Sequence, residues 1–248
     1  MKLAIISDIH EDIVSLRLAI ARIEKEQCDE IICLGDISGF SEPYYPYRQT
    51  RNAHECLAVI RANCKIIIAG NHDLNASRII PENSPLFNYP EDWYDMDYFE
   101  KMEVSQGKLW MYDENELNPL YSKSDIEFIS LLPEYEILTF GEKNIFFSHY
   151  LYPNITGSIK AMSHAHEVVA PHLELVREKG CDIAFAGHEH NRKGIIYAEN
   201  GVRFFGKRIK MSPVDLSCVL IPAIASGPNR NGFCIFDLNS WSLKIKRL

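Results

Sequence analysis

Four apolar segments of the chain end in side chains of the kinds that bind metal ions: LAIISDIH, IICLGD, KIIIAGNHD and IAFAGHEH. They deliver, in that order, Asp8 and His10, Asp36, Asn71 and His72, and His188 and His190. A fifth segment, NIFFSHY, delivers His149 in the same manner. Histidine, aspartate and asparagine form a mixed nitrogen and oxygen ligand set, which suits Mn, Fe, Zn, Ni or Co better than Ca. The pattern therefore predicts a transition-metal site.

The elements that must position these ligands are buried strands. Each segment is rich in Ile, Leu, Ala or Cys before it breaks at Gly, Asp or His, which is typical of a buried strand reaching the edge of its sheet. In open α/β sheets, ligands collect beyond the carboxyl ends of the strands. Asp8 and His10 are two residues apart, as are His188 and His190, and in extended chain this spacing places both side chains on one face. We therefore expect one shared crevice.

The candidate ligands are more numerous than one ion needs. They are Asp8, His10, Asp36, Asn71, His149, His188 and His190. Two divalent ions sharing a bridging carboxylate are the economical arrangement. With Asp8 and Asp36 as the anionic ligands the site stays positive and attracts phosphate, and metal lowers the pKa of bound water from ~15.7 towards ~7. His72 follows Asn71 and is not needed as a ligand, so we expect it to protonate a departing oxygen.

Composition restricts the possible settings and partners. At 248 residues the chain is long enough for one large α/β domain, and its formal net charge of -8 argues against strong nucleic-acid binding or attraction to anionic membranes. The seven cysteines form no CxxC pair, which indicates reduced thiols and a cytoplasmic protein. No apolar run approaches the ~18 residues of a membrane span, so we expect no membrane partner. The oligomeric state stays open.

Alternating helix and strand patterns predict one layered α/β domain over residues 1–248. Within it, segment 75–132 departs from the pattern because prolines interrupt it and Trp, Tyr and Phe enrich it. We expect this segment to be a helical or irregular insertion that caps the crevice.

The motifs resemble, in chain order, those of the calcineurin-like metallophosphoesterase superfamily: Asp8-x-His10, Gly35-Asp36, Gly70-Asn71-His72-Asp73, His149 and Gly187-His188-x-His190. The resemblance spans nearly the whole chain and implies a four-layer αββα sandwich. It implies that one divalent ion is held by Asp8, His10, Asp36 and His190. It implies that a second ion is held by Asp36, Asn71, His149 and His188, with Asp36 bridging and His72 near the scissile phosphate. The metal stays open among Mn, Fe, Zn and Ni.

Departures from the superfamily's better known branches bear on the substrate. GDISGF and GNHD stand where protein serine/threonine phosphatases and symmetrical dinucleoside tetraphosphate hydrolases have GDxVDRG and GNHE. The chain is more similar to the small bacterial phosphodiesterase branch, whose SDIHGN is here SDIHED. We hypothesise that Glu11 and Asp12, lying close to the phosphate, disfavour doubly charged monoesters relative to singly charged diesters.

Candidate substrate contacts follow Asp36 and precede the C-terminal strands. Tyr44 and Arg48 fit a nucleobase platform with a phosphate clamp, although a loop packed on the sheet edge explains the segment equally well. Arg230 is placed to reach a phosphate, and a turn-surface arginine is equally plausible.

Together these features predict a dinuclear metal-dependent hydrolase that cleaves a small phosphodiester or nucleotide-type substrate by in-line attack of a metal-bridging hydroxide. A phosphomonoesterase or a dinucleoside polyphosphate hydrolase is the alternative within the same chemistry. A non-catalytic scaffold of the same fold is the alternative from another class, and the complete ligand set disfavours it. A nuclease acting on long DNA would need a basic groove, which the net charge of -8 does not indicate.

Overall fold

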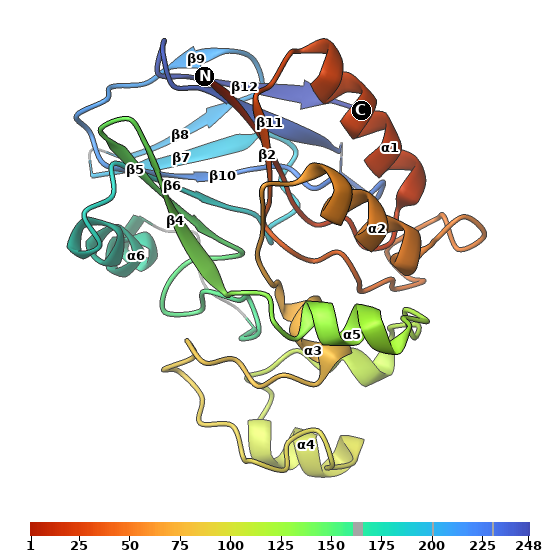
Figure 1. Ribbon diagram of the computed structural model, residues 1–248. Helices are drawn as coiled ribbons and strands as arrows, with labels where there is room; N and C mark the ends of the chain where they lie inside the picture. The colour runs from red at the N-terminus through yellow and green to blue at the C-terminus, as the bar shows by residue number, and fades with distance from the viewer. Residues whose placement is uncertain (161–165, 200, 230) are drawn as a thin grey trace.

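Two six-stranded sheets lie face to face at the centre of the protein, with helices on both outer sides (Figure 1). The structure, a computed structural model, describes residues 1–160, 166–199, 201–229 and 231–248. The first sheet contains, in spatial order, β3 (Ile66–Ile67), β2 (Glu30–Cys33), β1 (Lys2–Ile6), β11 (Gly232–Asp237), β12 (Ser242–Arg247) and β9 (Ile209–Lys210). The second contains β4 (Tyr135–Phe140), β5 (Lys143–Ser148), β6 (Ile183–Ala186), β10 (Ser217–Leu220), β7 (Gly194–Ala198) and β8 (Gly201–Phe205).

Both sheets mix parallel and antiparallel pairs. β1, β2 and β3 are parallel neighbours, and β5, β6 and β10 are parallel neighbours in the second sheet. β11 returns antiparallel beside β1, with Ala4 opposite Ile235. The parallel strands of each sheet therefore end at a common edge, where the loops that follow them meet.

Period-two alternation along β1 divides the core into layers. Leu3 and Ile5 point between the sheets, where they join Phe185 of the second sheet. Ala4 and Ile6 point outward and pack with the buried faces of α1 (Ile13–Lys25) and α2 (Ala53–Asn63).

The second sheet is covered on its outer side by α6 (His166–Glu178), whose Val169, Leu173 and Val176 pack on Phe146 and Ala184. The order of layers is thus helix, sheet, sheet, helix. The predicted four-layer αββα sandwich is confirmed.

His172 of α6 is completely buried, and its Nδ1 accepts a hydrogen bond of 3.0 Å from the Tyr152 backbone N–H. The proton of the neutral ring therefore sits on Nε2, which has no hydrogen-bond partner among the described residues. Burial lowers the pKa of His172 to about 3. The side chain is a neutral core histidine.

Segment 75–132, the expected insertion, leaves the sheets after α3 (Asn71–Ser77) and contains α4 (Tyr98–Ser105), the 3-10 turn η1 (Tyr112–Glu114) and α5 (Lys123–Ile129). Its outer part has a small core of its own around Trp93, Leu109 and Met111, and α4 lies at the end of the molecule farthest from β9 (Figure 1). In contrast, Ile129 of α5 packs into the core beneath α1 and α2. The single-domain division and the boundaries 75–132 stay a prediction.

The Glu134 carboxylate fastens the base of this segment, because it accepts hydrogen bonds from the backbone N–H groups of Glu82 and Asn83 and from the Asn83 side chain.

Within the described residues, no helix has the length and apolar character needed to cross a membrane. All seven cysteines are free thiols, and five of them are buried.

Candidate metal centre

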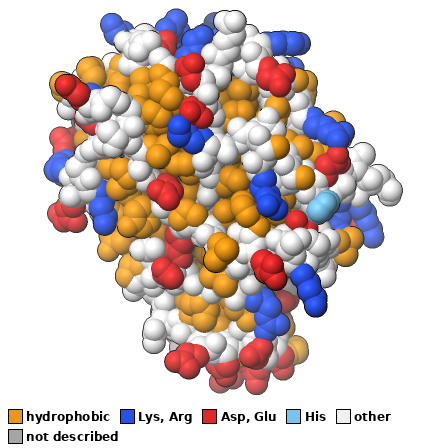
Figure 2. All heavy atoms as spheres, in the orientation of Figure 1, with side chains coloured by type: hydrophobic (Ala, Val, Ile, Leu, Met, Phe, Trp, Pro, Cys, Tyr) orange, Lys and Arg blue, Asp and Glu red, His pale blue; other side chains and the backbone are white. Residues whose placement is uncertain are grey.

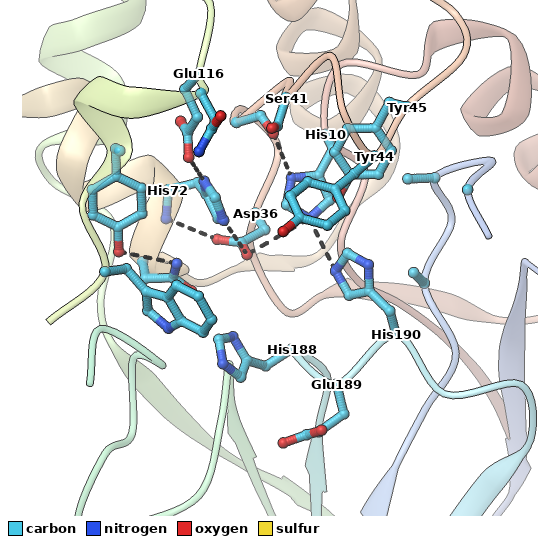
Figure 3. Close-up of a pocket in the computed structure, with 18 of the residues that line it drawn as sticks. His10, Asp36, Ser41, Tyr44, Tyr45, His72, Glu116, His188, Glu189 and His190 are labelled. Atoms are coloured by element: carbon cyan, nitrogen blue, oxygen red, sulfur yellow. Dashed lines mark hydrogen bonds and ion pairs between the residues drawn. The ribbon is translucent and has the colours of Figure 1, made fainter. Parts of the chain in front are cut away.

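The expected metal ligands meet where the parallel strands of the two sheets end. Figure 3 shows four of them, His10, Asp36, His188 and His190. Two groups of donor atoms each lie within 4.8 Å of one another: the first group is Asp8, His10 and His190, and the second group is Asp36, His149 and His188. A further set at the same spacing, His10, Asp36 and His72, overlaps both groups. The loops after β1 and β2 of the first sheet supply Asp8, His10 and Asp36, whereas the loops after β5 and β6 of the second sheet supply His149, His188 and His190. The crevice therefore draws its donors from both sheets.

The first group surrounds His190. Its Nε2 lies 3.1 Å from Asp8 Oδ1 and 3.1 Å from His10 Nε2. The Nδ1–H of His10 donates to the Gly39 carbonyl at 3.0 Å, which leaves the lone pair of Nε2 facing His190. Two imidazole nitrogens thus approach each other with the Asp8 carboxylate beside them, an arrangement suited to a shared cation.

The second group surrounds His149. Its Nδ1–H donates to the Leu34 carbonyl at 2.7 Å, so its Nε2 faces Asp36 Oδ2 at 3.1 Å and His188 Nδ1 at 3.2 Å. Asp36 Oδ2 also lies 3.8 Å from His10 Nε2 in the first group. Asp36 is therefore the carboxylate that stands between the two groups.

Asn71, the first residue of α3, turns its amide oxygen toward the second group. A Cβ atom built on Gly157 would lie 2.9 Å from Asn71 Oδ1 and 2.5 Å from His188 Nδ1, which shows that the two donors flank the same spot. Asn71 Oδ1 is buried and has no hydrogen-bond partner among the described residues. Its amide nitrogen donates to the Tyr112 hydroxyl at 3.0 Å. A buried oxygen left unpaired costs stability unless a cation binds it.

The protonation states fit a cation-binding donor set. Burial, aided by the neighbouring His72, lowers the pKa of His10 to about 3, and burial with the nearby His149 lowers that of His188 to about 3. Burial alone would raise the pKa of Asp36, but His149 and His72 hold it well below its usual range. Burial alone would lower the pKa of His149, but Asp36 raises it to about 9, so this ring holds a proton that a bound cation would displace. Neutral imidazoles, ionised carboxylates and an unpaired amide oxygen are the donors that divalent transition metals take. The residues present therefore fit such ions.

The backbone achieves this convergence differently from the extended geometry that the two-residue spacings suggested. β1 ends at Ile6 and β6 at Ala186, before the ligands begin. Five of the expected ligands have φ between 46° and 68°, in the left-handed region: Asp8, His10, Asp36, His188 and His190. For residues other than glycine this conformation costs roughly 1–2 kcal/mol each. The expectation of extended pairs was wrong, and tight turns rather than strands aim these side chains.

Backbone hydrogen bonds hold those turns in place. The N–H groups of Ile9 and His10 both donate to the Asp36 carbonyl, at 2.7 and 2.9 Å. The Asp73 carboxylate accepts from the N–H groups of Ile37, Ser38 and Gly70 at 3.0 to 3.2 Å, and so joins the loop after β2 to the start of α3. The aspartate of the GNHD motif is therefore a structural clamp.

His72 lies beside the groups and is held from the opposite side. Its Nδ1 forms an ion pair with Glu116, and its Nε2 lies 3.8 Å from Asp36 Oδ2 (Figure 3). Burial alone would lower the pKa of His72, but the Glu116 and Asp36 carboxylates raise it to about 10. The imidazole is therefore positively charged and carries a proton that it can donate.

A cavity of about 870 Å³ opens over the ligands. Segment 75–132 supplies one wall of it: Trp110, Met111, Tyr112, Glu114, Asn115 and Glu116. Tyr44 and Tyr45 belong to the wall that follows Asp36, and Tyr45 stacks on the His10 ring at a centroid distance of 5.0 Å. Glu116 and Tyr112 were missed in the sequence because they lie about 40 residues beyond His72 in a segment without a regular pattern.

Of the three expected substrate contacts, one lines the cavity, one does not, and one lies outside the described residues. Tyr44 lines the cavity and is mostly exposed to it. Arg48 is absent from the cavity lining and instead forms an exposed ion pair with Glu42, which corrects its expected role as a phosphate clamp. Arg230 lies outside the described residues.

Glu11 and Asp12 do not face the cavity, contrary to the hypothesis that they select against monoesters. Glu11 is buried, pairs with Arg51 at 2.8 Å and accepts the Phe40 N–H. Asp12 caps α1 by accepting the Ser15 N–H at 2.9 Å. Both carboxylates hold loops, and that hypothesis loses its structural basis.

Comparisons with known proteins agree with this geometry. A family model described as calcineurin-like phosphoesterase matches residues 1–192, more than three quarters of the chain. The chain therefore belongs to the calcineurin-like phosphoesterase family, as the motifs indicated. The members of this family act on phosphoesters and use divalent metal ions.

Individual relatives are distant. An uncharacterised protein of Methanocaldococcus jannaschii is 23% identical over 266 aligned residues, which cover 99% of this chain and 86% of that protein. The fold is similar to that of a metallophosphoesterase from Sphaerobacter thermophilus, with a TM-score of 0.65, 17% identity, and coverage of 100% of this chain and 88% of the other. A hypothetical protein from Pyrococcus horikoshii gives a TM-score of 0.60, 13% identity, and coverage of 100% and 87%. At these identities the two solved structures support the fold alone.

Proposed function

We propose that the protein is a dinuclear metal-dependent phosphoesterase that hydrolyses a small phosphodiester or nucleotide-type ester. The observation that carries the proposal is the position of Asp36, whose carboxylate stands between two groups of histidine and carboxylate donors. Asp8, His10 and His190 would hold one ion with Asp36, and Asn71, His149 and His188 would hold the other. Mn, Fe, Zn and Ni all accept such ligands.

When bound, the two ions would supply a hydroxide nucleophile at neutral pH and neutralise charge that develops on the phosphate. The protein's own contribution begins with orientation, since backbone carbonyls fix the rings of His10 and His149. His72 then donates its Nε2 proton to the departing oxygen, because its Nδ1 is occupied by Glu116 and its Nε2 faces the donor groups. The cavity walls hold the rest of the ester away from water.

The charges of the cavity favour a diester over a polyphosphate. Among the described lining residues, Lys160 is the single lysine or arginine, whereas three glutamates line the same space: Glu114, Glu116 and Glu189. A long polyphosphate chain would place several negative charges near those carboxylates, while a diester carries one charge, which the ions neutralise. Tyr44 and Trp110 offer exposed aromatic surface for a flat or apolar substituent.

A nuclease acting on long DNA gains no support from the surface. On the face shown in Figure 2, Lys and Arg side chains are scattered, and acidic side chains gather at the end formed by α4. Exposed acidic residues of that end include Asp92, Asp95, Glu100 and Glu103. A continuous basic groove is the feature such an enzyme needs.

A metal-by-substrate screen tests the proposal. Wild-type protein loaded with Mn, Ni, Fe or Zn should hydrolyse bis(p-nitrophenyl) phosphate faster than p-nitrophenyl phosphate or a dinucleoside polyphosphate. Asp36→Asn should lose most bound metal and nearly all activity, whereas Asp215→Asn, which removes an exposed carboxylate, serves as the matched control. Wild-type protein that binds no transition metal after supplementation would instead support the non-catalytic scaffold.

A second variant tests the role of His72. His72→Ala should retain both ions yet lose rate, most severely for esters with poor leaving groups. An equal loss for good and poor leaving groups would remove His72 from the role of proton donor.

A further inference from the structure

The two side chains at the start of α3, Asn71 and His72, are each held by the segment inserted between α3 and α5. We propose that Tyr112 and Glu116 of this segment are positioning residues, which orient the Asn71 amide and the His72 imidazole for catalysis. The inference rests on the proposed function, because it takes Asn71 as a metal ligand and His72 as the proton donor. It makes the insertion part of the catalytic machinery as well as a wall of the cavity.

The contact with Asn71 holds the amide in place beside the donor groups. Asn71 Nδ2 donates to the Tyr112 hydroxyl at 3.0 Å, while the unpaired Oδ1 is buried beside His188. An amide has a donor end and an acceptor end, and only the oxygen binds a cation. Through its contact with the NH₂ group, Tyr112 holds the amide in the position in which the oxygen faces the second group.

The contact with His72 sets which ring nitrogen faces the cavity. Glu116 occupies Nδ1 from one side, and the Gly39 backbone packs so closely that a Cβ there would lie 2.4 Å from the same nitrogen. The Tyr112 ring meets the imidazole edge-on at a centroid distance of 5.1 Å. The ring is therefore held in a slot with Nε2 directed toward Asp36 (Figure 3).

Both contacts come from one short unit, residues 112–117, which backbone hydrogen bonds hold in place. Tyr112 begins the turn η1, and the Glu116 N–H donates to the Tyr112 carbonyl at 3.1 Å. Glu116 forms a β-bridge with Ser41, and the Leu117 N–H donates to the Phe40 carbonyl at 3.0 Å. The unit is thus bound to the loop that carries Asp36, so a displacement of the insertion would disturb Asn71 and His72 together.

Four variants separate positioning from a merely structural role. Glu116→Ala should lower kcat about 100-fold with KM changed less than about threefold, because the ring loses its orientation while the metal stays. Glu116→Gln should recover most of the rate, since its side chain keeps an oxygen at the same place beside His72 Nδ1. Asp113→Asn, which removes an exposed charge from η1, and Tyr94→Phe, which removes a hydroxyl within the core of the insertion, are the matched controls.

A double-mutant cycle ties Glu116 to His72. In a His72→Ala background, Glu116→Ala should cause no further loss, because both changes remove the same oriented donor. A further loss of about tenfold or more would overturn the positioning role, as would a Glu116→Gln variant no more active than Glu116→Ala.

Metal binding provides a readout that does not depend on activity. Titration with Mn²⁺ should show that Tyr112→Phe lowers the affinity for one of the two ions about tenfold, the usual effect of removing a hydrogen-bond partner of a metal ligand. Tyr94→Phe should leave the affinities for both ions unchanged. Equal affinities in Tyr112→Phe and wild type would refute the role of Tyr112. Wild-type protein that binds two ions but cleaves no phosphoester would refute the proposed function instead, while the Tyr112 result still stands.

Discussion

The substitution Gly157→Ala should remove one metal ion while leaving the fold intact. Gly157 has φ +81°, and a Cβ atom there would lie 2.5 Å from His188 Nδ1 and 2.9 Å from Asn71 Oδ1. An ordinary contact begins near 3.4 Å, so the methyl group must push His188 Nδ1 away by about 0.9 Å. Metal–nitrogen distances tolerate a change of only about 0.2 Å. The substitution should therefore displace two proposed ligands of the second ion at once.

The magnitudes for stability and for metal binding differ. A left-handed alanine costs about 1–2 kcal/mol of backbone strain, and the displaced side-chain ends can move into the cavity at little further cost. In contrast, losing the geometry of two ligands should weaken the second ion about 100-fold or more, or about 2.7 kcal/mol at 25 °C. Gly180→Ala is the matched control, because Gly180 has φ +67° and no atom within 4 Å of the position its Cβ would take.

The assay combines chemical denaturation in EDTA with metal analysis after loading and dialysis. Both alanine variants should lose a similar 1–2 kcal/mol of unfolding free energy, but Gly157→Ala should keep about one ion per chain and Gly180→Ala about two. Two tightly bound ions in Gly157→Ala would refute the placement of Asn71 and His188 as ligands of one ion.

Three further substitutions test other parts of the structure. Burial lowers the pKa of His172 from 6.5 to about 3, so the histidine takes up a proton in the unfolded chain at a higher pH than in the folded protein. Wild type should therefore lose about 2 kcal/mol of unfolding free energy between pH 7.5 and pH 5, and His172→Asn should not show this loss. Urea denaturation at both pH values measures the difference. Arg51→Met leaves the buried Glu11 carboxylate without its partner and should cost about 3 kcal/mol at pH 8, and the double variant with Glu11→Gln should regain much of this in thermal denaturation. Glu134→Ala frees the backbone N–H groups at 82–83, so hydrogen exchange there should speed up about tenfold or more while the sheets stay protected.

The sequence contained enough information for the sheets and for the donors. Runs such as LAII and IAFA are buried strands, β1 and β6, because a continuous apolar run suits a strand covered on both faces. The metal-binding residue types then stood out at the ends of those runs. Both signals are local, so they survive without knowledge of the tertiary structure.

Long-range contacts could not be predicted in the same way. From the sequence, Glu11 was expected to lie beside the phosphate site, but its carboxylate is buried and forms an ion pair with Arg51. Glu116 reaches His72 only after the chain has passed through an irregular segment, and nothing near His72 in the sequence indicates it. The left-handed turns at Asp8 and His10 were also hidden, because backbone hydrogen bonds between loops impose them against the usual preference of these residues.

The division of the donors between two sheets has a thermodynamic consequence. Asp8, His10 and Asp36 lie in loops that follow strands of one sheet, and His149, His188 and His190 lie in loops that follow strands of the other, so a cation bound among them would join the two halves of the sandwich directly. Ions that bind only the assembled sandwich stabilise it by RT ln(1 + [M]/Kd), or about 2.7 kcal/mol for one ion at a hundredfold excess over Kd. With the proposed ions bound, the unfolding equilibrium of the whole chain would become a measure of free metal concentration, and metal limitation would lower the amount of folded protein.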